Sequence, residues 1–458
     1  MKLHYTVLAL LLSSCQSSKT EVVNEGKPIQ FVTLDPGHFH AALIQKSMYH
    51  DVDSTVHVYA PAGPDLEMHL KRIDAFNSRE ENPTKWKEIV YSGEDFLQKM
   101  IDEKAGNVAV LSGNNQRKTE YIKRSLQAGF HVLADKPMAI DSAGFNDLKE
   151  AFSIAEKNEL LLYDIMTERN EITTMFQREF SMSQPIFGNL QNGTIDNPAV
   201  TKESVHYFHK FVSGAVLTRP AWFMDGAQQG DGLVDVTTHL VDLVQWGCFP
   251  EQIVNYLEDV KIHNARHWPT TMTLHQFRTI TKNEKFPDYL KKGLLNDTTL
   301  SIYCNGEINY KIKGVHAKVS VTWNYKAPEG GGDTHYSVMR GSKANLVIRQ
   351  GSDTDFKPEL FIEPLNNDLS YEKDLIDEVN KIQLKYPGIT LVKSAKGWKV
   401  QIPENYRTGH EAHFAEVTKK FLEYLTNKNM PSWEVPNMIA KYYTTTQALE
   451  MAVNKRSN

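Results

Sequence analysis

The stretch that decides the fold runs from Val110 to Ala139 and reads VLSGNNQRKTEYIKRSLQAGFHVLADKPMA. It begins inside an apolar strand expected over Asn107–Ser112, continues with an amphipathic segment over Gln116–Ala128, and then contains a second apolar strand over His131–Ala134. Short apolar runs that alternate with helical segments favour a parallel sheet with helices packed against it. This stretch therefore predicts one unit of an α/β sheet.

The same alternation extends outward on both sides, from Ile29 to about Ser181. Further strands are expected at Ile29–Leu34, Thr55–Tyr59 and Leu160–Tyr163, with helices at His38–His50, Asp65–Phe76 and Ser142–Lys157. The pattern predicts an α/β, Rossmann-type domain over residues 29–183, built on a doubly wound parallel sheet.

The pattern changes beyond Gln184. Alternating segments at Asn309–Thr322 and His335–Arg349 read as antiparallel strands, with a Gly330–Gly332 turn between them. Residues 184–365 therefore predict an α+β domain with an open, mainly antiparallel sheet. Helical segments at His410–Leu425 and Val435–Val453 lead us to expect a helical extension over 366–458 that packs on the body.

The loop after the first strand departs from a usual dinucleotide site. It reads Asp35-Pro36-Gly37-His38-Phe39-His40, and only Gly37 matches the glycines that let backbone approach a pyrophosphate. The second strand ends at Ala60 without the acid that would bind the ribose. We expect NAD as the cofactor and leave NADP open.

A second motif, GDGLVDVTTHLVD, covers Gly230–Asp242. With this motif and the Asp135-Lys136-Pro137 sequence, the chain resembles the Gfo/Idh/MocA family of oxidoreductases, which has Glu-Lys-Pro after the corresponding strand. The resemblance runs from Ile29 to at least Arg349. It implies a two-domain enzyme that uses NAD(P) to transfer hydride to or from a sugar.

The resemblance also assigns roles to particular residues. His239 would be the acid/base, Asp235 a supporting or substrate-binding carboxylate, and Lys136 the group that hydrogen-bonds the reacting hydroxyl. The cofactor-binding residues would be Gly37, His38, Phe39, His40, Ser112, Gly113, Asn115, Asp135 and Lys136. The candidate substrate-binding residues are Arg169, Trp222 and Asp242. Arg169 resembles the family's active-site arginine, with a helix-capping ion pair as the alternative, and Trp222 could stack on a sugar or pack in the core. Without the family resemblance, we would interpret Lys136 as a surface residue. Asp235 and His239, four positions apart, would then form an ion pair on one face of a helix.

The N-terminus predicts export. A short apolar run over Tyr5–Leu12 is too short to span a bilayer and reads as a signal peptide over residues 1–14. Leu12-Ser13-Ser14-Cys15 resembles a bacterial lipobox, which implies lipidation of Cys15, a tether over 15–28 and a place in the cell envelope, anchored to a membrane. An ordinary secretory signal with an incidental cysteine is the alternative.

Location outside the cytoplasm constrains the chemistry, because no large NAD(P) pool exists there. We expect a tightly held cofactor, a sugar or oligosaccharide substrate, and a place in polysaccharide breakdown. Three alternatives stay open: a redox-assisted glycoside hydrolase or lyase of the same family, a non-catalytic carbohydrate-binding lipoprotein, and a cytoplasmic dehydrogenase.

The composition argues against a nucleic-acid-binding protein, a disulfide-rich protein and a cysteine-based metal site. A net charge of −5 with mixed charges gives no reason to expect nucleic acid as a partner. Three cysteines cannot form a disulfide framework or a thiolate metal cluster. His410-Glu411-Ala412-His413 is one residue short of the zinc-protease spacing, so we interpret it as structural and expect no metal. The family resemblance implies a homo-oligomer.

Overall fold

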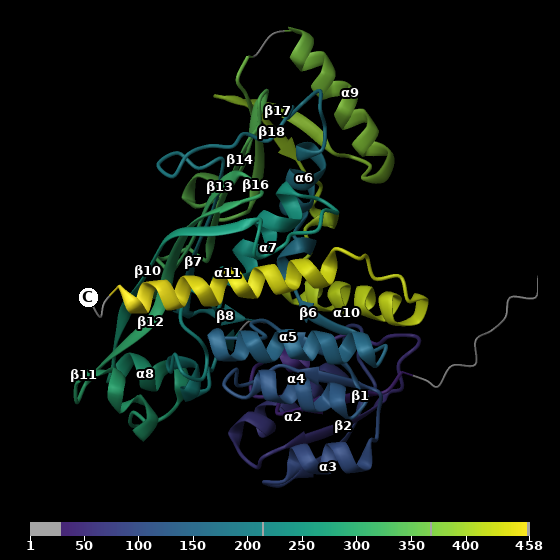
Figure 1. The fold of residues 1–458 in the computed structure, drawn as a ribbon, viewed down its shortest axis with the longest axis vertical. Coiled ribbons are helices and arrows are strands. Elements are labelled where there is room, and N and C mark those ends of the chain that lie inside the picture. Colours follow the sequence, from purple (N-terminus) through teal and green to yellow (C-terminus); the bar gives the residue numbers. More distant parts are fainter. Residues whose placement is uncertain (1–28, 213–214, 367–368, 456–458) are drawn as a thin grey trace, which may run out of the picture.

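The computed structural model describes residues 29–212, 215–366 and 369–455 (Figure 1). The predicted signal peptide (1–14) and the tether with Cys15 (15–28) lie outside the described residues. Within the described part of the chain, no helix is both long enough and apolar enough to cross a bilayer.

The N-terminal part is a six-stranded parallel sheet in the order β3-β2-β1-β4-β5-β6. Its strands are β1 (Phe31–Leu34), β2 (Thr55–Ala60), β3 (Lys87–Ser92), β4 (Val108–Leu111), β5 (His131–Asp135) and β6 (Leu162–Ile165). The predicted Rossmann-type sheet is thereby confirmed. The strand order reverses between β1 and β4, and ligands of such sheets bind at this point, beyond the carboxyl ends of the strands.

Helices cover both faces of this sheet, which explains why β1, β4 and β6 are buried at every position. The helices of this part are α1 (His40–Ile44), α2 (Pro64–Ser78), α3 (Phe96–Glu103), α4 (Lys118–Gln127) and α5 (Ser142–Lys157). The Asp141 side chain caps α5 by accepting a hydrogen bond from the N–H of Gly144.

The second sheet has ten strands and is antiparallel except where β13 runs parallel to β7. This confirms the predicted open, mainly antiparallel sheet. Its strands are β7 (Val200–His209), β10 (Val260–Thr273), β11 (Leu294–Asn296), β12 (Thr299–Ile312), β13 (Val315–Lys326), β14 (Thr334–Arg340), β15 (Ala344–Gln350), β16 (Glu359–Pro364), β17 (Thr390–Ser394) and β18 (Gly397–Gln401). A separate hairpin joins β8 (Phe211–Val212) to β9 (Ala215–Val216).

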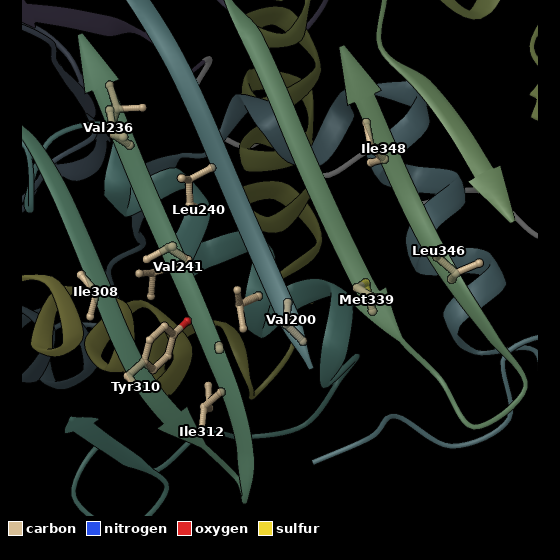
Figure 2. Close-up of a cluster of buried hydrophobic side chains, with 14 of the residues drawn as sticks. Val200, Val236, Leu240, Val241, Ile308, Tyr310, Ile312, Met339, Leu346 and Ile348 are labelled. Carbon is tan, nitrogen blue, oxygen red and sulfur yellow. The ribbon is translucent and has the colours of Figure 1, made fainter. Parts of the chain in front are cut away.

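Helices pack on one face of this sheet, and Figure 2 shows Leu240 and Val241 of α7 against Val200, Ile308 and Tyr310 of the strands. The strands β12 and β13 alternate buried and partly exposed residues, as expected of a sheet with one covered face. The helices of this part are η1 (Thr167–Asn170), α6 (Ile172–Ser181), η2 (Ala221–Met224), α7 (Thr237–Cys248), α8 (Leu274–Thr281), η3 (Asp288–Gly293) and η4 (Ser352–Thr354).

The last part of the chain is not purely helical, which corrects the prediction for 366–458. Here α9 (Leu369–Lys385) is followed by β17 and β18, which extend the second sheet through pairing of β18 with β16. The chain then continues through η5 (Glu404–Tyr406) into α10 (His410–Asn427) and α11 (Glu434–Asn454). Figure 1 shows α11, in yellow, running between the two sheets.

Candidate active site

A cleft of about 1600 Å³ opens beyond the carboxyl ends of the parallel strands and faces the second sheet. The loops after β1, β5 and β6 form one wall, and β7, the start of α7 and the segment before α10 form the others. Its polar lining includes His38, His40, Lys136, Glu168, His206, His209, Asp235, His239, His335, Arg407, His410 and His413.

Lys136, Asp235 and His239, predicted as the catalytic group, all line this cleft. Lys136 follows β5, and its Nζ lies 2.6 Å from Oδ1 of Asp235, with both side chains largely buried. Asp235 lies in the turn before α7, and His239 lies in the first turn of that helix. The sheet and the helix thus bring together three groups from two distant motifs.

Burial and the neighbouring charges set the protonation states. Burial lowers the pKa of His239 to about 3, and the positive charge of Lys136 contributes in the same direction. Burial raises the pKa of Asp235, but the charge and hydrogen bond of Lys136 outweigh it, so the pKa lies below its usual value. At neutral pH the site therefore holds a neutral imidazole beside a carboxylate.

Four of the predicted cofactor residues, His38, Phe39, His40 and Lys136, line the cleft, but Gly37 is covered. A Cβ at Gly37 would lie 2.9 Å from Oδ2 of Asp65 and 3.3 Å from Cζ2 of Trp222. The indole Nε1 of Trp222 donates to Oδ2 of Asp65 at 2.8 Å. We call these two side chains the Trp222–Asp65 cover.

The N–H groups of this loop are also used within the protein. Gly37 donates its N–H to the carbonyl of Asp35 at 2.8 Å, and His38 donates to the carbonyl of Ser112 at 3.2 Å. Burial raises the pKa of both Asp35 and Asp65, which lie close enough to interact. A pyrophosphate could approach Gly37 only if the Trp222–Asp65 cover moved.

The remaining predicted cofactor residues hold the protein together around this loop. A Cβ at Gly113 would lie 2.0 Å from the carbonyl oxygen of Asp35, so only glycine allows this approach of two loops. Asn115 donates from Nδ2 to the carbonyl of Gln229 at 2.7 Å, and its N–H to the carbonyl of Gln228 at 2.9 Å. Asn115 thus fixes the segment after η2 against the Rossmann sheet.

The three predicted substrate ligands do not line the cleft, and their placement corrects that assignment. Trp222 lies over Gly37, as described above. Arg169 donates to both oxygens of Asp242 at 2.7 Å and to both oxygens of Glu434 at 3.0 and 3.1 Å. Asp242, 1% exposed, also accepts from Lys441 at 2.9 Å. These charges satisfy one another inside the protein.

The structure also adds residues that the sequence analysis missed or set aside. Glu168 lines the cleft, where Nδ1 of His410 lies 3.2 Å from its Oε1. Asp65, in the first turn of α2, is a carboxylate that follows β2 closely in the chain, although Ala60 at the end of that strand is not acidic. The Pro64-Asp65 pair, typical of a helix N-terminus, could have indicated this carboxylate.

Comparisons with known proteins agree with this architecture. Residues 35–163 match the family model "Oxidoreductase family, NAD-binding Rossmann fold", and residues 176–453 match "Putative oxidoreductase C terminal domain". A search of curated proteins found no match. A crystal structure of a "putative oxidoreductase" from Parabacteroides merdae is 56% identical, covers 93% of this chain and 98% of its own, and has a TM-score of 0.91.

More distant structures share the fold. A levoglucosan dehydrogenase in complex with NADH and L-sorbose is 11% identical over 93% of this chain and 97% of its own, with a TM-score of 0.59. A Synechocystis biliverdin reductase in complex with biliverdin and NADP+ is 11% identical over 93% and 99%, with a TM-score of 0.54. The two domain matches and the close structure show that this chain belongs to the Gfo/Idh/MocA family of NAD(P)-dependent oxidoreductases.

Proposed function

We propose that the protein transfers hydride between NAD(P) and a CH–OH group of a sugar or glycoside. The observation that carries this proposal is that Lys136, Asp235 and His239 all line one cleft, with Lys136 in contact with Asp235 beside the loops of the nucleotide-binding sheet. The sugar complex of the levoglucosan dehydrogenase with the same fold supports this substrate class.

Each of the three residues has a role that its surroundings support. The ammonium group of Lys136, oriented by Asp235 at 2.6 Å, stabilises the alkoxide that forms as the hydroxyl loses its proton. His239 is neutral and can accept that proton. The positive charge that lowers the pKa of His239 also favours the alkoxide, which compensates for a weak base. Bound NAD(P) supplies the acceptor for the hydride.

The size and lining of the cleft support a substrate with many hydroxyl groups. Its volume of about 1600 Å³ exceeds that of a typical small-ligand pocket, about 300–1,000 Å³. Phe223 and Trp323 offer ring faces, and Glu168, His335 and Arg407 offer donors and acceptors. Part of this space would hold the nicotinamide end of NAD(P), and the rest suits a sugar or a glycoside.

We also propose that Cys15 is lipidated in the cell envelope and that the cofactor stays bound between turnovers. Lipidation at Cys15 and a place in the cell envelope would bring the enzyme to polysaccharide fragments. A cofactor that stays bound between turnovers would suit that location. Lipidation and cofactor retention are both inferred from the sequence. Mass spectrometry of the mature chain tests lipidation by detecting acylation of Cys15.

Nucleotide analysis and substrate assays test the proposal directly. We expect the purified protein, once denatured, to release NAD(H) or NADP(H), and a panel of sugars and glycosides to change the NAD(P)H absorbance. Lys136→Ala and His239→Ala should each lower turnover by about 10²- to 10⁴-fold while the fold persists. The exposed His50 and Lys419 provide matched controls, His50→Ala and Lys419→Ala. Full turnover in either active-site variant would refute these roles.

A further inference from the structure

Two imidazoles that line the cleft meet a buried carboxylate, next to the proposed catalytic group but separate from it. His38 and His40 come from the loop after β1, and Asp135 is the last residue of β5. Their candidate ligand atoms all lie within 4.8 Å of one another. Nδ1 of His40 lies 2.9 Å, and Nδ1 of His38 lies 3.8 Å, from Oδ2 of Asp135.

The topology of the sheet explains this meeting. Strands β1 and β5 both flank β4, so the segments at their carboxyl ends converge at one edge of the sheet. The alternation His38-Phe39-His40 places two imidazoles on either side of a single residue, and their ring centroids are 4.0 Å apart. Asp135 then faces both rings from the end of β5.

Surrounding groups hold the three side chains in place. Ser112 donates from Oγ to Oδ2 of Asp135 at 3.0 Å, and Lys118 donates from Nζ to the backbone carbonyl of Asp135 at 3.0 Å. The ring of Phe414, on α10, packs on His40 at 4.5 Å. Such outer contacts orient the ligands of metal sites in proteins.

A hydrogen bond between His40 and Asp135 does not by itself account for the arrangement. Oδ2 of Asp135 already has His40 and Ser112 as hydrogen-bond partners, and Nδ1 of His38, at 3.8 Å, is too far away to share that hydrogen bond. Nδ1 of His38 instead accepts a long hydrogen bond from the N–H of His40 at 3.4 Å. His38 nevertheless stays beside both groups on the wall of the cleft. A common ligand of all three side chains would explain why both imidazoles approach the same oxygen.

We propose that His38, His40 and Asp135 bind one divalent first-row transition metal ion, of the Zn²⁺ or Fe²⁺ type, with its open positions toward the cleft. Two imidazoles with one carboxylate suit these ions, whereas Ca²⁺ and Mg²⁺ prefer oxygen ligands throughout. Three protein ligands leave coordination positions for water or a substrate oxygen. This inference does not rest on the proposed function.

The proposal departs from the sequence prediction of no metal, which considered only His410 and His413 as histidine ligands. Asp135 lies 95 residues from His40 along the chain, so no local spacing marks the set. His410 and His413 of the zinc-protease-like segment are not part of the His38–His40–Asp135 cluster, although the ring centroid of His410 lies 5.9 Å from that of His40.

Metal analysis of the full chain tests the proposal. The protein is stripped with a chelator and titrated separately with Zn²⁺, anaerobic Fe²⁺ and Mg²⁺ by calorimetry, and with Co²⁺ by visible absorption. We expect one Zn²⁺ or Fe²⁺ ion per chain, no comparable binding of Mg²⁺, and Co²⁺ bands that report nitrogen ligands. His38→Ala and Asp135→Asn should weaken binding by at least about 100-fold, since even outer contacts contribute about 10- to 100-fold.

His206→Ala is the matched control, because His206 lines the same cleft beside an acid, with Nδ1 3.2 Å from Oδ2 of Asp333, but lies outside the cluster. It should keep the metal. Circular dichroism checks that each variant is folded. The Co²⁺ spectrum of the unchanged protein tests the site even if a variant fails to fold. The proposal would be overturned if the unchanged protein bound none of Zn²⁺, Fe²⁺ and Co²⁺. It would also be overturned if His206→Ala lost as much metal affinity as His38→Ala and Asp135→Asn. NAD(P) binding, measured separately, distinguishes this failure from failure of the proposed function.

Discussion

At the scale of single residues, some side chains that match substrate-binding positions of the family are buried in ion pairs and have a structural role. Arg169 and Asp242 resemble substrate ligands in sequence, yet they form a buried network with Glu434 and Lys441. Lys441, fully buried, also lies 2.7 Å from Oδ2 of Asp164. Each charge in this network has an opposite charge as its partner, so none is free to bind a substrate hydroxyl.

Replacing Asp242 tests this structural role. Asp242→Asn keeps the shape but removes the negative charge that faces Arg169 and Lys441, and losing one member of a buried pair costs about 3–5 kcal/mol. We expect the free energy of unfolding in urea to fall by about that amount, with KM unchanged in the folded protein. The exposed Asp297→Asn is the control. A raised KM with unchanged stability would restore the substrate-binding assignment.

At the scale of elements, the segment from η2 to Gly230 connects the second sheet to the Rossmann sheet. Trp222 lies over Gly37, and Asn114 donates from Nδ2 to Oε1 of Gln228 at 2.7 Å. Asp225 accepts hydrogen bonds from the following turn, which keeps this segment compact. One short segment thus covers the place where a pyrophosphate would lie.

Removal of the cover should ease nucleotide binding. In Trp222→Ala the indole no longer lies over Gly37, and Asp65 loses its hydrogen-bond donor, so less has to move before the pyrophosphate enters. We expect a several-fold higher affinity for added NAD+ by calorimetry. Trp268→Ala, which removes an indole on β10, should leave that affinity unchanged. Weaker binding in Trp222→Ala would mean that the indole contacts the nucleotide rather than covering its site.

At the scale of the whole molecule, the C-terminal helix joins the two cores. Ala440 and Ala448 of α11 belong to the core of the second sheet, whereas Met438 and Tyr442 pack in the core of the Rossmann sheet. Tyr442 also donates to Oδ2 of Asp164 at 2.9 Å. The two sheets are therefore held in one relative arrangement around the cleft by a helix that comes last in the chain.

Buried neutral histidines should make the molecule sensitive to acid. Burial lowers the pKa of His69 and His239 to about 3 and of His40 and His335 to about 4. The unfolded chain, with histidine pKa values near 6.5, then binds more protons than the folded chain, so stability falls as the pH drops from about 7 toward 4. The cost is on the order of 1–2 kcal/mol for each histidine at pH 5.

Urea denaturation at a series of pH values checks this expectation. Burial raises the pKa of Glu88 to about 7, which has the opposite sign, because that carboxyl loses stability as the pH rises through 7. The raised pKa values of Asp35 and Asp65 act in the same direction as that of Glu88, whereas the lowered pKa values of Glu168 and Asp242 act with the four imidazoles. The denaturation midpoint should therefore fall between pH 7 and pH 5, and a flat profile would contradict the neutral, buried state of these histidines.

The sequence by itself determined the order of most Rossmann strands and helices, both domain types and the residues of the two motifs. These features depend on local periodicity and on short spacings, as in the apolar run Val108–Leu111. In and around the second sheet no element was predicted at β7, β10, β16, α8 or α9, and in the Rossmann domain strand β3 and the helix α3 after it were missed. β3 lies at the edge of its sheet, and Ile89 and Val90 are exposed there, so the strand lacks the buried pattern that marks the others.

Only the tertiary structure decided what surrounds each motif residue. The pairing of Lys136 with Asp235 spans 99 residues, and that of Arg169 with Glu434 spans 265. Contacts at such separations depend on how two sheets and a final helix pack, and no local pattern encodes them. For this reason the motifs named Lys136, Asp235 and His239, whereas the histidine–aspartate cluster and the cover over Gly37 emerged only once the chain was folded.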